Sequence, residues 1–200
     1  AFAFDEGAPR RTHLYKGVTG NSLGFEEEIE ELGLTLSYRW QGCDAFGWTR
    51  RVVVTNAGAQ AITLSVLDGL RDLQPYGISA HISQTSSCLA DAYKRSEIER
   101  ESGLGIYALT SRIIDRAEAS EMLRSNVAWS VGLDGPRLLT LDQLPAFREG
   151  RPLEPEDDVR GDRAGYFATG EVTLAPGASH TWWTVADVGL SHEAILELTR

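Results

Sequence analysis

Cysteine, methionine and long apolar runs are all scarce in this sequence of 200 residues, which has two cysteines and one methionine. Cys43 and Cys88 can form at most one disulfide, and only if the fold brings their Cα atoms within about 7 Å of each other. We expect two buried free thiols, since disulfides are rare in cytoplasmic proteins. A chain of this length can bury roughly 70% of the surface that it exposes when unfolded. Its core therefore does not depend on a disulfide.

No apolar run approaches the roughly 20 residues that a membrane-spanning helix needs. The chain also does not open on the basic and then apolar pattern of a signal peptide. We therefore expect a soluble, cytoplasmic protein. The sequence starts at Ala1 without an initiator methionine and stops inside a helical pattern, so we also expect that it is a fragment of a longer chain that continues past residue 200.

Positive charge is in the minority. Lysine and arginine together number 19 against 29 aspartates and glutamates, which gives a net charge of −10 and a pI near 4.9. Nucleic acids and anionic membranes repel such a protein. We therefore predict no nucleic-acid partner and no membrane partner.

The common cofactor motifs are missing. The sequence has no glycine-rich phosphate loop, no G-x-S-x-G nucleophile elbow and no Cys/His spacing of a zinc site. The acidic stretch from Glu154 to Asp162 does not match the calcium loop D-x-D-x-D-G, and Pro155 interrupts it. We predict no cofactor and no metal.

The strongest pattern in the chain is a strand pattern between Gly33 and Leu73. Apolar and polar residues alternate from Leu34 to Trp40, which is typical of a strand with one buried face. A second strand, rich in β-branched residues, runs from Phe46 to Asn56. The next four residues, from Asn56, predict a tight turn because Asn and Gly tolerate a positive φ, and a third strand begins at Ile62. We predict three consecutive antiparallel strands.

The remainder of the chain adds short strands and few helices. We predict an irregular or edge segment over Ala1–Thr19, strands over Asn21–Glu31 (an outer strand or hairpin arm), Gly105–Ala117, Ser125–Leu133, Tyr166–Leu174 and His180–Val188, a helix within Ser83–Arg100, a long loop over Leu141–Ala164, and a helix over His192–Arg200 capped by Ser191. About nine short strands with hairpin-like spacing predict an all-β, mainly antiparallel β-sandwich with one or two short helices. We expect residues 1–200 to form a single domain.

Carboxylates and histidines are the first candidates for catalysis. A glycosidase needs two carboxyl groups about 5–9 Å apart. Asp68 and Asp72 end one predicted strand, and Asp115, Glu118 and Glu121 follow another. Acidic residues this numerous must fall near one another somewhere, so we do not predict a catalytic pair.

Sugar recognition is the second possibility, because aromatic rings stack on sugar rings and charged groups bind the hydroxyls. We single out Trp48, Trp182, Trp183, His81 and Asp68 as sugar-binding candidates. Among the histidines, only His81 follows a strand where a site on the sheet could lie. Trp182 and Trp183 are adjacent in a predicted strand, so their side chains must point to opposite faces.

Three phrases carry a family resemblance: FGWTRRVVVTNAGAQAITLSVLDGL from Phe46, RGDRAGYFATGEVTLAPGASHTWWTVADVG from Arg160, and SHEAILELTR from Ser191. Together they resemble the β-sandwich domain, of the galactose-mutarotase-like supersandwich type, that precedes the helical barrel of cellobiose-phosphorylase-like glycoside hydrolases. The resemblance implies that the catalytic and phosphate-binding residues belong to a barrel that would follow residue 200. It also implies that the sandwich packs against that barrel, helps it to oligomerise and can border the sugar site.

Three functions stay open. The first is a non-catalytic module of a glycoside hydrolase or phosphorylase that binds carbohydrate or packs against the catalytic domain, with no catalytic activity in this chain alone. The second is a mutarotase or epimerase-like enzyme, which needs a histidine acid and a carboxylate base on a concave sheet face to move protons at O1 and O5. The third is a self-association module that forms a homodimer. A flat apolar face with Trp182 or Trp183 exposed would favour packing.

Overall fold

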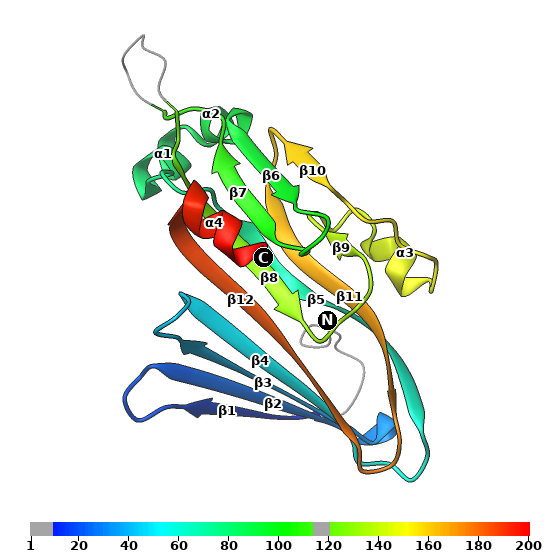
Figure 1. Ribbon diagram of the computed structural model, residues 1–200. Helices are drawn as coiled ribbons and strands as arrows, with labels where there is room; N and C mark the ends of the chain where they lie inside the picture. Colours follow the sequence, from blue (N-terminus) through cyan, green and yellow to red (C-terminus); the bar gives the residue numbers. More distant parts are fainter. Residues whose placement is uncertain (1–9, 114–120) are drawn as a thin grey trace. The chain divides into compact units, whose positions relative to one another are not determined.

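The computed structural model describes residues 10–113 and 121–200, and about half of them lie in strands of mainly antiparallel sheets (Figure 1). This confirms the predicted all-β fold, and the described residues contain four short α-helices where one or two were predicted. The chain divides into two compact units, each built from three segments. Unit 1 contains residues 10–68, 130–135 and 168–185, and unit 2 contains the described residues of 69–129, 136–167 and 186–200. The strands β5, β8, β11 and β12 contribute residues to both units.

Unit 1 has a sheet of five neighbouring strands. Their order is β1 (Arg10–Lys16), β2 (Ser22–Ile29), β3 (Leu34–Gly42), β4 (Trp48–Asn56) and the first half of β12 (Ser179–Ser191), with the short 3-10 helix η1 (Glu30–Leu32) between β2 and β3. The pairs β1–β2, β2–β3 and β3–β4 are antiparallel and in continuous register. This confirms the predicted hairpin arm over 21–31 and the first two central strands. Alternation along these strands gives the sheet an inner and an outer face.

The inner face of this sheet packs against the second sheet of unit 1, formed by the first part of β5 (Ile62–Leu73) and the last part of β11 (Ala164–Leu174). The core between them is apolar and includes Ile29, Leu34, Val52, Val54, Val172, Leu174 and Trp182. The prediction that β5 pairs with β4 is wrong, because β5 belongs to the other sheet. The connection after β4 is a crossing between sheets and not a tight hairpin.

Asn56 explains that crossing. Its side chain is 1% exposed, donates to the carbonyls of Gln60 (2.8 Å) and Leu174 (3.1 Å), and accepts from the backbone N–H of Gly58 (3.0 Å). The expected positive φ is absent at both Asn56 and Gly58; it occurs at Gly33, where φ is 60°. A Cβ at Gly33 would lie 2.9 Å from the Cα of Gly58. Asn56 therefore holds the crossing by its side-chain hydrogen bonds. Gly33 and Gly58 are needed because their backbones approach closely.

Unit 2 has a sheet of its own. Its order is the second half of β12, then β8 (Arg124–Val131), β7 (Gly105–Leu109), β6 (Lys94–Ile98) and β10 (Asp158–Arg160), and the unit also contains the remaining parts of β5 and β11 with β9 (Arg137–Leu138). Helix α4 (His192–Leu198) places Ile195 against Leu104 and Val127 in a buried cluster. The Oγ of Ser191 accepts from the N–H of Ala194 at 3.3 Å, which confirms the predicted N-cap.

The helix predicted within 83–100 is present but shorter than the spacing indicated, because it ends at Ala92 and Lys94–Ile98 form a strand. The structure has two short helices, α1 (Ala80–Thr85) and α2 (Ser87–Ala92), followed by strand β6. In β6, the buried residues Lys94, Ser96 and Ile98 alternate with less buried ones. This period of two is that of a strand and not of a helix. The Nζ of Lys94 lies 2.6 Å from Asp91 Oδ1, so the buried ammonium is neutralised.

The long loop predicted over 141–164 also has regular structure. It contains helix α3 (Leu144–Arg148) and strand β10. The carboxylate of Glu156 organises its start, because it accepts from the backbone N–H groups of Leu139 (2.8 Å) and Thr140 (2.7 Å) and from the amide of Gln143 (2.9 Å). The strand predicted over 105–117 is shorter, since β7 ends at Leu109; residues 114–117 lie outside the described residues.

Both cysteines are free, as expected, but Cys43 and Cys88 are exposed and not buried. Across the described ranges 10–113 and 121–200, no helix is long and apolar enough to cross a membrane.

Candidate functional site

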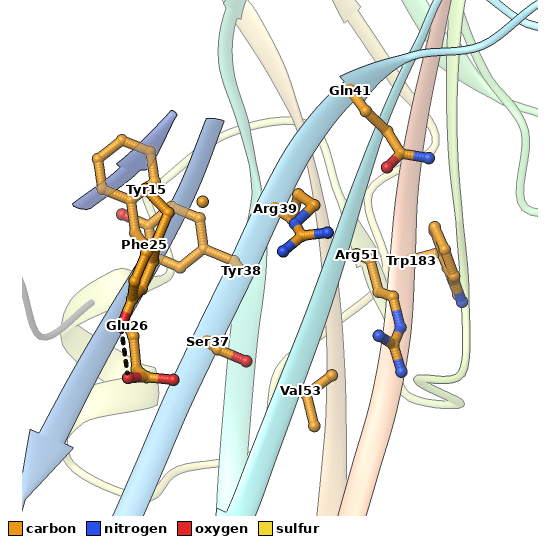
Figure 2. A pocket seen from close by; sticks show the side chains of 11 residues that line it. Tyr15, Phe25, Glu26, Ser37, Tyr38, Arg39, Gln41, Arg51, Val53 and Trp183 are labelled. Carbon is orange, nitrogen blue, oxygen red and sulfur yellow. Dashed lines mark hydrogen bonds between the residues drawn. The ribbon is translucent and has the colours of Figure 1, made fainter. Parts of the chain in front are cut away.

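A groove of about 650 Å³ lies on the outer face of the unit 1 sheet (Figure 2). Side chains from all five strands line it, including Tyr15 from β1, Glu26 from β2, Ser37, Arg39 and Gln41 from β3, Arg51 and Val53 from β4, and Trp183 from β12. The stacked rings of Phe25 and Tyr38, whose centroids are 4.8 Å apart, also line it. Its walls are therefore set by strand register and not by loops, and side chains on strands are held more rigidly than those on loops.

Register explains why these side chains meet. Glu26 lies opposite Ser37 in the β2–β3 pair, and Ser37 lies opposite Val53 in the β3–β4 pair. One step along the same face, Gly24 lies opposite Arg39, which lies opposite Arg51. The polar residues that alternate with the buried side chains of β3 thus form the floor of the groove.

The two ends of the groove are aromatic. Figure 2 shows Tyr15 at one end and Trp183 at the other, with the polar side chains between them. Tyr15 is 52% exposed, and its hydroxyl donates to Glu26 Oε1 at 3.3 Å. Desolvation and then the negative charge of Glu26 raise the pKa of the Tyr15 hydroxyl. This hydroxyl therefore stays protonated at neutral pH and acts as a hydrogen-bond donor.

Gly24 keeps the floor open beside Tyr15. A Cβ at this position would lie 3.6 Å from Tyr15 Cβ and 3.8 Å from Arg39 Nε. A glycine inside a strand often marks a place where a ligand approaches closely. A larger side chain here would fill the space between the phenol ring and the guanidinium group.

Two guanidinium groups stand next to each other in the groove. Arg39 and Arg51 are directly opposite in the β3–β4 register, and both are exposed. Neither forms an ion pair with a residue that the structure describes. The Cζ of Arg51 lies 5.8 Å from the ring centroid of Trp183, a cation–π contact that orients the group. The groove is thus locally electropositive in a protein of net charge −10.

Trp182 and Asp68 lie together on the inner face, away from the groove. The Trp182 Nε1–H donates to Asp68 Oδ2 at 2.6 Å, and Arg50 Nη2 lies 2.5 Å from Asp68 Oδ1. Trp182 is 3% exposed, and Arg50 also stacks over Trp40 with its Cζ 5.2 Å from the ring centroid. Of the predicted sugar-binding residues, only Trp183 lines the groove, and Trp182 points to the opposite face as predicted.

The other two predicted residues are separate from the groove. Trp48, at the start of β4, is 56% exposed, and the register places it opposite Gly42. His81 is exposed in α1 of unit 2. No histidine is among the described residues that line the groove. The groove therefore lacks the histidine acid that the mutarotase hypothesis requires.

The candidate carboxylate pairs find little support in the described part of the chain. Asp68 is bound to Arg50 and Trp182, while Asp72 and Glu121 are exposed. Asp115 and Glu118 lie outside the described residues. Within the groove itself, Glu26 is the one lining carboxylate among the residues described.

One residue cluster could in principle hold a metal ion. Ligand atoms of His13, Glu26 and Glu28 lie within 4.8 Å of one another on the same sheet face. Both carboxylates already have partners, however, since Tyr15 bonds to Glu26 and Arg11 Nη1 lies 3.9 Å from Glu28 Oε2. We assign no metal site to this cluster.

Most of the groove was not identified from the sequence. The alternation of β3 indicated that Ser37 and Arg39 share an outer face, but no local signal places Tyr15 and Trp183 at the ends of one groove. Comparison of the sequence with protein-family profiles and with curated proteins found no match. The resemblance to cellobiose-phosphorylase-like enzymes therefore stays a prediction.

Proposed function

We propose that unit 1 is a non-catalytic carbohydrate-binding module, and that its ligand lies in the groove between Tyr15 and Trp183. One observation carries the proposal: an open groove on a sheet face has an aromatic ring at each end and hydrogen-bonding side chains between them. Aromatic faces stack on the apolar faces of sugar rings, and a sugar needs hydroxyl partners between such contacts.

The polar side chains suit those hydroxyls. Glu26 offers a carboxylate acceptor, Gln41 offers both an amide donor and an acceptor, and Arg39 offers several N–H donors in a fixed plane. The volume of about 650 Å³ falls within the roughly 300–1,000 Å³ of small-molecule sites. The groove is thus large enough for more than a single small anion.

Binding fits this groove better than hydrolysis. A glycosidase flanks the scissile bond with two carboxyl groups, whereas Glu26 is the one carboxylate that the described residues contribute to the lining. We therefore propose that this groove binds a carbohydrate and does not hydrolyse it. If a catalytic domain accompanies unit 1, catalysis belongs to that domain. The module would present a carbohydrate to that domain.

Packing against a catalytic domain is a second candidate, and a separate observation favours it. Leu14, Leu23 and Trp48 are exposed, and alternation places all three on the inner face of the unit 1 sheet. If this surface mediates self-association instead, sedimentation velocity of the chain will show a dimer that Trp48→Asp dissociates. A monomer at all concentrations would remove the homodimer hypothesis.

The test of carbohydrate binding is calorimetric titration with a panel of neutral and acidic oligosaccharides, including cellobiose. We expect Trp183→Ala and Tyr15→Ala each to weaken binding about tenfold, since an aromatic contact contributes about 0.5–1.5 kcal/mol beyond the area that it buries. Trp48→Ala is the matched control, because it removes an exposed tryptophan outside the groove. No binding to any sugar, or equal losses in all three variants, would refute the proposal.

A further inference from the structure

We propose that the groove selects a carbohydrate carrying an anionic group, a carboxylate or a phosphate ester, and that Arg39 and Arg51 bind this group. This inference rests on the proposed carbohydrate-binding function and names its ligand class. Three observations support it: the two arginines lie opposite each other in the groove, no described carboxylate pairs with either of them, and the polar groups at the two ends of the groove differ in charge.

The two arginines lie side by side in the sheet. Arg39 and Arg51 are paired across β3 and β4, so their Cα atoms are direct neighbours on one face. Figure 2 shows both guanidinium groups in the groove, between Tyr15 and Trp183. Two planar groups with several N–H donors each match the oxygens of a carboxylate or phosphate, which arginine binds in bidentate fashion.

Arg39 and Arg51 differ from several other arginines because no described carboxylate pairs with them. Six arginines form ion pairs with aspartate or glutamate: Arg11, Arg50, Arg95, Arg100, Arg151 and Arg160. Like charges directly opposite on neighbouring strands destabilise a sheet. Acidic residues outnumber basic ones by 29 to 19, yet no described acidic side chain pairs with Arg39 or Arg51. A bound anion would neutralise both.

Polar contacts lie at both ends of the groove, although Phe25, Tyr38 and Val53 also line it. Trp183 contacts Arg51 at one end, and Tyr15 bonds to the carboxylate of Glu26 at the other. An anionic group near Glu26 would be repelled, whereas neutral hydroxyls can donate to that carboxylate. The anionic group of the ligand therefore lies at the Arg39–Arg51 pair, and the neutral sugar ring extends toward Tyr15.

The test compares matched ligands by calorimetry: cellobiose against cellobiouronic acid, and glucose against glucose 6-phosphate, with inorganic phosphate alone as a further arm. We expect the acidic member of at least one pair to bind about tenfold or more tighter than its neutral parent, the effect of a charge-assisted hydrogen bond. The pair that shows the preference identifies the anionic group. Raising the salt concentration from 20 to 200 mM should reduce the preference.

Variants assign the effect to the two arginines. Arg39→Gln and Arg51→Gln, singly and together, should bring the two affinities within about twofold of each other, because the charge-assisted bonds are lost. Arg11→Gln is the matched control, since it removes the same charge from the same sheet face outside the groove. Thermal melting confirms that each variant folds, which exposed side chains should allow.

The failures are distinguishable. Equal affinity for acidic and neutral sugars, or a preference that survives the double variant, overturns the anionic-ligand inference and leaves carbohydrate binding intact. Inorganic phosphate binding as tightly as the sugar phosphate, with no effect of Tyr15→Ala, means that the sugar ring contributes nothing. That result overturns both the inference and the proposed function.

Discussion

The two faces of the unit 1 sheet differ most clearly at two adjacent residue pairs. Arg50 and Arg51 follow each other in β4, and Trp182 and Trp183 follow each other in β12. On the inner face, Arg50 and Trp182 both contact Asp68, which pairs with the guanidinium and accepts from the indole. On the outer face, Arg51 and Trp183 contact each other and have no carboxylate partner among the residues described.

The two faces of the sheet therefore have different roles: the inner face stabilises the fold, and the outer face is available to a ligand. The inner residues are largely buried, and Asp68 bonds both to Arg50 and to the Trp182 indole, so these contacts hold β4, β5 and β12 together. The outer residues keep their hydrogen-bonding capacity for a ligand. A strand that alternates faces can thus supply the core and the groove from neighbouring positions. Mutations at the two faces should therefore affect different measurements.

The largest predicted effect contrasts the two tryptophans. Trp182→Ala should lower the free energy of unfolding by about 3–5 kcal/mol, because it empties a buried site and removes the donor to Asp68. Trp183→Ala should lower it by less than about 1 kcal/mol and instead weaken sugar binding. Urea denaturation of both variants measures the difference. Equal destabilisation would show that the two faces are not functionally distinct.

The second prediction concerns Asp68. Asp68→Ala should destabilise unit 1 by about 2–3 kcal/mol, because it leaves Arg50, only 11% exposed, without its carboxylate and the Trp182 indole without its acceptor. Asp44→Ala, at an exposed loop position, is the control and should change stability by less than about 0.5 kcal/mol. If Asp68→Ala weakened sugar binding without a loss of stability, the inner cluster would belong to the binding site.

The third prediction concerns Gly24, which lies on the outer face in the groove. Gly24→Val should reduce sugar affinity about tenfold, or about 1.4 kcal/mol, because its side chain would fill the space between Tyr15 and Arg39. The free energy of unfolding should change by less than about 1 kcal/mol, since valine favours strands and the Cβ itself meets only ordinary contacts. Calorimetry and urea denaturation of the same variant test both parts. Unchanged affinity would place the ligand elsewhere.

Much of this fold follows from local patterns in the sequence. The alternation in β3 predicts its two faces, and the adjacency of Trp182 and Trp183 predicts that they diverge. The sequence does not show that β5 leaves the sheet of β4, because the buried bonds of Asn56 reach Leu174, which is distant in the chain. The groove is hidden for the same reason, since its two ends come from the first and the last strand of unit 1.

The smallest predicted effect concerns Glu99 in unit 2, a carboxylate whose hydrogen bonds lie within the chain. Glu99 accepts from the Ser102 hydroxyl (2.6 Å), the Ser102 N–H (2.7 Å) and the Glu101 N–H (3.1 Å), and these bonds, the hydroxyl first, lower the pKa of its carboxyl from 4.5. Because the folded pKa lies below the unfolded value, the stabilisation is present above about pH 4.5 and is lost as pH falls through the folded pKa.

Glu99 is exposed to solvent, which limits the effect to a few tenths of a kcal/mol, about the size of a surface ion pair. Glu99→Gln should therefore be slightly less stable than the parent at pH 7 and equally stable at about pH 3, by urea denaturation. Glu101→Gln is the control, because its side chain accepts no hydrogen bond within the described structure. A difference that persists at low pH would mean that Glu99 stabilises the β6–β7 turn by packing and not by its charge.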